Sequence, residues 1–109
     1  MLIRAFRMAL QPGQEAEYQR RHDQIWPELS GALRDAGILD YRIFLDRKSH
    51  ALFAVMQLRD DHQVDRLAER EVMQRWWDYM ADIMATHDDH SPITVPLEEV
   101  FTFMPVESS

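Results

Sequence analysis

The run ALFAVM, residues 51–56, is apolar at every position. A strand with one face in water alternates apolar and polar residues, so an uninterrupted apolar run indicates a strand whose two faces are both covered. The segment Tyr41–Asp46 precedes this run, and the polar turn RKSH separates the two. Two strand-like segments joined by a short polar turn predict a β-hairpin. We therefore expect a sheet that contains the strands 41–46 and 51–58 and is buried on both faces.

Two further strands are predicted near the ends of the chain. Residues 2–10 (LIRAFRMAL) are rich in apolar residues and are followed by a Pro-Gly turn signal. Residues 97–104 (LEEVFTFM) predict the last strand, in which two phenylalanines lie opposite Val100 and Met104. Both faces of this last strand are therefore expected to be buried as well.

Two helical regions separate these strands. The first begins at Gln14 and ends at Gly37, a residue typical of the position just past a helix. It contains Pro27, and proline lacks a backbone N–H and clashes with the preceding turn of a helix. We therefore expect Pro27 to open a second helical piece, with irregular backbone over residues 22–26. The second helical region is expected to start at residues 60–61. A break is expected at residues 69–71, and a helix is expected to follow over residues 72–84.

The order of elements is therefore β-α-β-β-α-β. This order predicts an α+β fold, the ferredoxin-like βαββαβ plait, in which a four-stranded antiparallel sheet carries its helices on one side. A chain of 109 residues suits one domain, so residues 1–109 are expected to form a single unit with a frayed tail at 105–109. Helices cover one face of such a sheet, and a second copy of the sheet would cover the other. We thus expect a homodimer, a dimeric α/β-barrel formed by sheet-to-sheet packing.

The composition excludes several functional classes. The chain has no cysteine, which leaves no disulfide, thiolate nucleophile or Cys-based zinc site and fits the reducing cytoplasm, where we expect the protein. Twelve basic and nineteen acidic residues give a formal net charge of −7, without a dense basic run. Nucleic acid and anionic membranes are therefore not expected partners. The N-terminal segment is too short and too often interrupted by arginine for a signal peptide or a membrane span. A neutral or cationic small ligand, such as a sugar, is favoured.

Tyr18, His22 and Trp26 recur at steps of four residues, which places them on one face of a helix. Aromatic residues at helical spacing usually belong to a core. A buried tyrosine or histidine, however, needs a hydrogen-bond partner or costs about 1–3 kcal/mol. From the residues alone, a structural histidine and a histidine in a functional site both remain open. Trp26 precedes Pro27, and packing is the favoured interpretation for it.

Trp76 and Trp77 are adjacent in the chain, so their side chains point about 100° apart on a helix. One indole is expected to pack inward, and the other to line a cleft or an interface. A sugar ring could cover an exposed indole, because its C–H face is apolar enough to stack on an aromatic ring. The alternative, in which both indoles pack in the core and the dimer interface, stays open. Tyr41, at the start of a strand, is by itself a weak signal.

The segment HDDH, residues 87–90, is the one group of histidines that resembles a metal cluster. Its spacing matches neither a helical pair of histidine ligands nor a zinc motif, so a solvated loop is favoured over a metal site. No glycine-rich phosphate loop and no G-x-S-x-G motif is present, and the chain has only three glycines.

Five segments in order resemble the L-rhamnose mutarotase family, over about residues 3–103. They are YQRRH, IWPEL, DYRIFLD, QRWWDYM and EEVF. The resemblance implies a ferredoxin-like plait that dimerises through its sheets. It implies an isomerase that interconverts the α and β anomers of L-rhamnose with no cofactor and no metal. It further implies a proton donor, His22, and substrate-binding residues Tyr18, Tyr41, Trp76 and Trp77.

The chemistry is consistent with these residue types. Anomers interconvert when the ring opens, the C1 carbonyl rotates and the ring closes on the other face of that carbonyl. Histidine can give and take a proton near neutral pH, and a positioned acid–base group typically contributes about 10²–10⁴-fold in rate. The partner that acts opposite His22, the tryptophan that faces the sugar and the preference for L-rhamnose over other pyranoses all stay open. Three alternatives remain: a cofactor-free monooxygenase-like plait enzyme, a sugar-binding module without catalysis, and a structural dimerisation domain.

Overall fold

The computed structural model describes residues 1–105. In chain order its elements are β1 (Leu2–Ala9), α1 (Glu15–Asp23), α2 (Pro27–Asp35), β2 (Ile38–Asp46), β3 (Ala51–Leu58), the 3₁₀ helix η1 (Val64–Glu69), α3 (Glu71–Met80) and β4 (Val95–Leu97). The tail expected at 105–109 lies, apart from Pro105, outside the described residues. No helix within residues 1–105 is long and apolar enough to cross a membrane.

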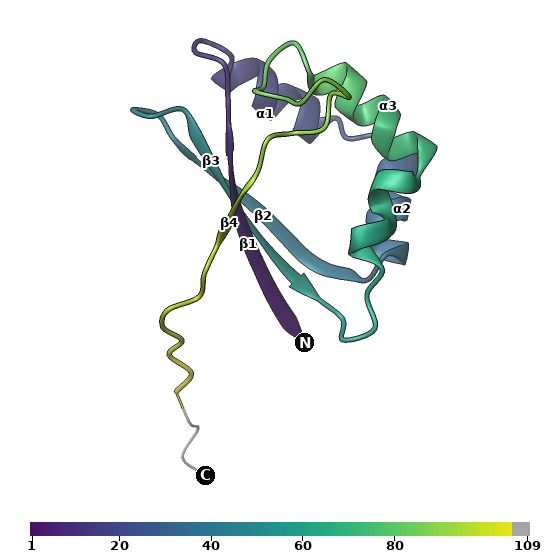
Figure 1. Cartoon of the computed structure of the whole chain (residues 1–109), viewed down its shortest axis with the longest axis vertical. Coiled ribbons are helices and arrows are strands. Elements are labelled where there is room, and N and C mark those ends of the chain that lie inside the picture. Colours follow the sequence, from purple (N-terminus) through teal and green to yellow (C-terminus); the bar gives the residue numbers. More distant parts are fainter. Residues whose placement is uncertain (106–109) are drawn as a thin grey trace.

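The four strands form one antiparallel sheet in the order β2-β3-β1-β4. The three α-helices lie on one side of this sheet (Figure 1). The predicted α+β ferredoxin-like plait is therefore confirmed. The hairpin of β2 and β3 is also confirmed, although β2 begins three residues earlier than expected, at Ile38. A register shift between Ile38 and Asp40 accommodates that early start.

Pro27 divides the first helical region as predicted. Helix α1 ends at Asp23, and Trp26 is extended (φ −64°, ψ 133°), as expected for the residue before a proline. Pro27 is the first residue of α2, where its missing N–H removes no helical hydrogen bond. Gly37 follows the end of α2 with φ +101°, a conformation that favours glycine. An added Cβ at Gly37 would also lie 2.9 Å from the Cβ of His62, so the position excludes a side chain.

The second helical region is shorter than predicted. Residues 64–69 form a 3₁₀ helix, and α3 ends at Met80, whereas the pattern predicted a helix through residue 84. The reason lies in competing backbone hydrogen bonds with the end of β1. The Gln11 N–H donates to the Ile83 carbonyl (2.8 Å), and the Ala85 N–H donates to the Ala9 carbonyl (3.0 Å). These tertiary bonds draw residues 83–85 away from the helix.

The prediction of a last strand over residues 97–104 is wrong. Strand β4 covers only Val95–Leu97 and pairs with the middle of β1. Residues 98–104 have no regular structure and extend away from the sheet (Figure 1), with Val100 87% and Phe101 78% exposed. A strand with apolar residues on both faces is favoured only when other parts of the protein cover both faces. Residues 1–105 of one chain cover neither face of this segment.

The two faces of the sheet differ sharply. The inner face packs against the helices and forms the core, in which Leu29, Leu52, Ala54 and Ile83 are almost fully buried. On the outer face, cross-strand neighbours place Phe44 beside Phe53 and Ala5 beside Leu97. This face is apolar in large part but uncovered, and Phe44 is 56% exposed. The sequence predicted a second layer over this outer face, supplied by another copy of the sheet. The structure describes a single chain, so the dimer stays a prediction.

Candidate active site

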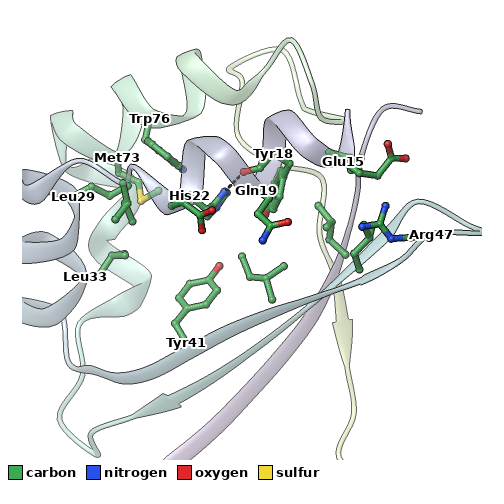
Figure 2. Close-up of a pocket in the computed structure, with 16 residues that line it drawn as sticks. Glu15, Tyr18, Gln19, His22, Leu29, Leu33, Tyr41, Arg47, Met73 and Trp76 are labelled. Carbon is green, nitrogen blue, oxygen red and sulfur yellow. Dashed lines mark hydrogen bonds between the residues drawn. The ribbon is translucent and has the colours of Figure 1, made fainter. Parts of the chain in front are cut away.

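A cavity of about 620 Å³ lies between the helices and the inner face of the sheet. Helix α1 forms one wall, and the strands β2 and β3 form the wall opposite (Figure 2). One end is apolar and contains Leu29, Leu33 and Met73, whereas the other end is polar and contains Glu15 and Arg47 (Figure 2). The volume lies within the usual range for small-molecule sites. Hence the cavity can hold a ligand that has both apolar and hydroxylated parts.

Helix α1 turns a polar face toward the cavity. The lining residues of α1 are Glu15, Tyr18, Gln19, His22 and Asp23. Their spacing of three, four, seven and eight residues defines one face of a helix. A face that packs into a core carries apolar residues, yet each of these side chains has a polar group. This face is therefore suited to contact a polar ligand.

His22 lies at the centre of this face. Its Nδ1 is 3.0 Å from the Tyr18 carbonyl oxygen, one turn earlier in α1 (Figure 2). The imidazole ring lies 4.2 Å from the Tyr18 ring, and the edge of the Trp76 indole is next to it, with centroids 5.4 Å apart. Burial lowers the pKa of His22 below its ordinary value. At neutral pH the imidazole is accordingly mostly uncharged.

Tyr18 and Tyr41 face the same cavity from opposite walls (Figure 2). Neither hydroxyl has a hydrogen-bond partner in residues 1–105, and no fully buried side-chain polar atom in that range lacks one. Both hydroxyls therefore open onto the cavity. Burial raises the pKa of Tyr41 to about 12, and burial together with the nearby Tyr41 raises the pKa of Tyr18 further. Two protonated phenols are thus free to bind a ligand.

The two adjacent tryptophans differ in position. Trp76 is 6% exposed and lines the large cavity, as well as a smaller one of about 70 Å³ behind the same side chains. Trp77 lines the smaller cavity but not the large one. Trp26 lines neither and packs edge-on against Trp76 and stacked on Tyr79, with centroid distances of 5.1 and 5.6 Å. Tyr18, His22, Tyr41 and Trp76 therefore line both cavities, and all five predicted site residues, Trp77 included, line the smaller one.

The HDDH segment forms a turn rather than a cluster of ligands. The Nδ1 of His90 lies 2.9 Å from Asp78, and the backbone N–H of Ser91 donates to Asp89 (2.9 Å). Within the described part of the chain, no three His, Asp or Glu side chains converge as a metal site would require. The segment connects α3 to β4, and His90 also lines the smaller cavity beside the site residues.

A family model described as L-rhamnose mutarotase matches residues 4–103. The chain belongs to the L-rhamnose mutarotase family. Two curated relatives with that name, from Acidiphilium cryptum and Paraburkholderia phytofirmans, are 60% and 57% identical over 97 residues. Each alignment covers 89% of this chain, and it covers 93% and 91% of the respective relative.

Solved structures agree with the family at the level of the fold. The crystal structure of an L-rhamnose mutarotase from Formosa agariphila superposes with a TM-score of 0.88 at 44% identity, over 95% of this chain and all of that one. A proposed antibiotic biosynthesis monooxygenase from Nitrosomonas europaea gives a TM-score of 0.59 at 11% identity, over 91% of this chain and 89% of that one. The second likeness concerns the fold alone. It shows that the two chains share the ferredoxin-like plait.

Sequence reasoning missed two residues beside the site in this mutarotase-family chain. Gln19 lines the cavity one turn before His22, and its helical spacing from His22 would have identified it. Arg21 is 9% exposed and donates to Glu17, to the Tyr79 carbonyl and to Asp82. No sequence signal predicts that contact, because Asp82 is 61 residues away in the chain.

Proposed function

We propose that this protein is an isomerase that interconverts the α and β anomers of L-rhamnose. The observation that carries the proposal is the convergence of one imidazole, two unpartnered phenols and one indole around a cavity of about 620 Å³. The chain's membership of the L-rhamnose mutarotase family supports the choice of sugar. The cytoplasm, expected from the cysteine-free sequence, is the proposed location.

The reaction needs proton transfer at two oxygens of the sugar. Ring opening removes the proton from the anomeric hydroxyl and delivers a proton to the ring oxygen, and ring closure reverses both transfers. We assign the proton-transfer role to His22, because its imidazole faces the cavity and histidine is the side chain whose ordinary pKa lies close to neutrality. Tyr18 and Tyr41 bind hydroxyls through their free phenols, and Trp76 packs against the apolar face of the sugar. Trp77 is assigned a supporting place behind Trp76.

The test is NMR exchange spectroscopy between the two anomers of L-rhamnose. Replacing His22 by Ala should lower the enzyme-catalysed exchange rate about 10²–10⁴-fold, the usual contribution of a positioned acid–base group. The matched control is His87→Ala, which removes an exposed histidine of the loop after α3. A folded His22→Ala variant that exchanges the anomers as fast as the wild type would falsify the assignment.

The same experiment separates catalysis from binding. A sugar-binding module would bind L-rhamnose without accelerating anomer exchange, so wild-type protein that binds and does not accelerate would support that alternative. The monooxygenase-like alternative is favoured by no specific feature of the cavity. The phenols at its centre and the polar residues at one end suit a hydroxylated ligand better than an apolar one.

We further propose that the protein is a homodimer formed by two outer sheet faces. Phe44, Phe53, Val55 and Leu97 lie on this face, and helices cover only the other face. Exposed apolar patches of this kind mark association surfaces. A two-fold axis would place like faces together and cover both.

A further inference from the structure

The hydrogen bond of His22 determines which ring nitrogen carries the proton. The Tyr18 carbonyl oxygen can only accept, so the Nδ1 that lies 3.0 Å from it must be the donor. In a neutral imidazole the other nitrogen, Nε2, then holds a lone pair. Within residues 1–105, Nε2 has no hydrogen-bond partner of its own. The neutral ring therefore offers a proton acceptor, not a donor, to a ligand.

The surroundings of the ring favour its neutral form. The Tyr18 ring is tilted by 30° to the imidazole and the Trp76 indole is nearly perpendicular to it, so water has limited access to the imidazole. Burial lowers the pKa of His22, and the Tyr18 carbonyl and Asp23 oppose this effect to a smaller extent. The other titratable groups that line the two cavities around His22 are Glu15, Tyr18 and Asp23 of α1, Tyr41 of β2, Arg47 of the turn after β2 and His90 of the loop after α3.

The wall opposite His22 supplies a group of the complementary kind. Tyr41 comes from β2, and its hydroxyl points toward the face of α1 that carries His22 (Figure 2). Burial raises the pKa of Tyr41 to about 12, so its phenol is protonated throughout the neutral range. A neutral phenol can donate to an oxygen that develops negative charge. The cavity thus has an acceptor on one wall and a donor on the other.

From this geometry we infer that His22 starts the reaction as a neutral base at the anomeric hydroxyl, while Tyr41 is the acid at the ring oxygen. The inference rests on the proposed function and adds to it the direction of each proton transfer. It gives Tyr41 a catalytic role, in addition to binding. It also assigns the donor role of His22 to ring closure.

The proton and electron balance closes within one cycle. In ring opening, Nε2 of His22 takes the proton of O1, the O1–H electron pair forms the C1=O1 double bond, and the C1–O5 bond breaks. The electron pair of that bond goes to O5, which takes the proton of Tyr41 Oη. After C1 rotates, the Tyr41 phenolate removes the O5 proton, O5 attacks the other face of C1, and the imidazolium returns its proton to O1. Both side chains regain their starting states, and no other reactant is needed.

The first test reads the tautomer directly. In protein labelled with ¹⁵N at histidine, the His22 resonances at pH 7.5 should show a protonated Nδ1 and an unprotonated Nε2. The His22→Ala variant assigns these signals. A protonated Nε2, either in the other tautomer or in the imidazolium, would overturn the inference whatever the activity of the enzyme.

The second test is the pH dependence of anomer exchange for L-rhamnose. A base works in its unprotonated form, so kcat/KM should rise with pH through the pKa of His22 in the free enzyme, with its midpoint below about 6.5, and then stay level through the mildly alkaline range. A kcat/KM that falls as pH rises through the pKa of His22 would show an acid instead. A wild type with no exchange activity at any pH would refute the proposed function, and the NMR tautomer would still be measurable.

The third test separates catalysis by Tyr41 from binding. Tyr41→Phe should lower kcat about 10²–10⁴-fold, with a much smaller change in KM. The control is Tyr79→Phe, which keeps the ring that stacks on Trp26 and lies outside both cavities. A Tyr41→Phe variant whose defect is confined to KM would show that Tyr41 only binds the sugar, and the acid role would be lost.

Discussion

Tyr18, His22 and Trp76 form a continuous line of rings that joins two helices. The Tyr18 and His22 centroids are 4.2 Å apart, and those of His22 and Trp76 are 5.4 Å apart. The sequence predicted the first contact, because residues four apart on a helix are neighbours. It could not predict the second, because Trp76 lies on α3 and reaches His22 only through the packing of the fold.

The difference between the two tryptophans leads to a prediction about fluorescence. L-rhamnose should change the indole emission, because Trp76 lines the large cavity and a bound sugar would replace water beside its ring. Trp76→Phe should remove most of this change. Trp77→Phe should keep it, because Trp77 does not line the large cavity. The measurement is a titration of emission against sugar concentration. A response that survives in Trp76→Phe and disappears in Trp77→Phe would reverse the assignment.

At the scale of elements, Arg21 joins α1 to the end of α3. Its guanidinium donates to the Tyr79 carbonyl (2.7 Å) and to Asp82 (2.9 Å), and it lies 4.5 Å from the centroid of the Tyr79 ring. A cation is favourable at the C-terminus of a helix, where carbonyl groups lack helical partners. Because His22 follows Arg21 in α1, the same contact holds the imidazole against α3.

Replacing Arg21 by Met should lower the free energy of unfolding by about 2–3 kcal/mol, the scale of lost hydrogen bonds to a charged group. Arg21→Lys should recover only part of this, because lysine lacks the planar fork that reaches both partners. The control is Arg20→Met. Arg20 is exposed and pairs with Glu17, so its loss should destabilise the fold much less than the loss of Arg21.

Chemical denaturation followed by circular dichroism would measure these differences. Equal losses of unfolding free energy in Arg21→Met and Arg20→Met would contradict the role of Arg21.

The break before α2 was predictable from Pro27 alone, since proline restricts both its own backbone and that of the residue before it. The end of α3 was not, because it depends on backbone hydrogen bonds to β1.

At the scale of the whole molecule, the outer sheet face and residues 98–104 remain uncovered in one chain. Phe44 is 56% exposed and Phe103 75%. The sequence predicted correctly that the sheet has apolar residues on both faces. It could not show what covers the outer face, because residues 1–105 of one chain supply no second layer on that side.

Phe44→Glu should convert the proposed homodimer to a monomer. The substitution places a charge beside Phe53 on the outer face, and a buried charge without a partner is strongly unfavourable. Size-exclusion chromatography with light scattering would give the mass of each species. Lys48→Glu, in the exposed turn between β2 and β3, is the control and should leave the mass unchanged. A wild type that is monomeric at all concentrations would contradict the dimer.

The local pattern of residues determined the strands 41–46 and 51–58, the break at Pro27 and the shared helical face of Tyr18 and His22. Each depends on neighbours within a few positions of the chain, for which backbone geometry is the governing constraint. The tertiary structure alone decided that Trp76 meets His22, that Tyr41 faces α1 across the cavity, and that Arg21 reaches Asp82. These contacts join segments 19 to 61 residues apart, and only the packing of the helices on the sheet brings them together.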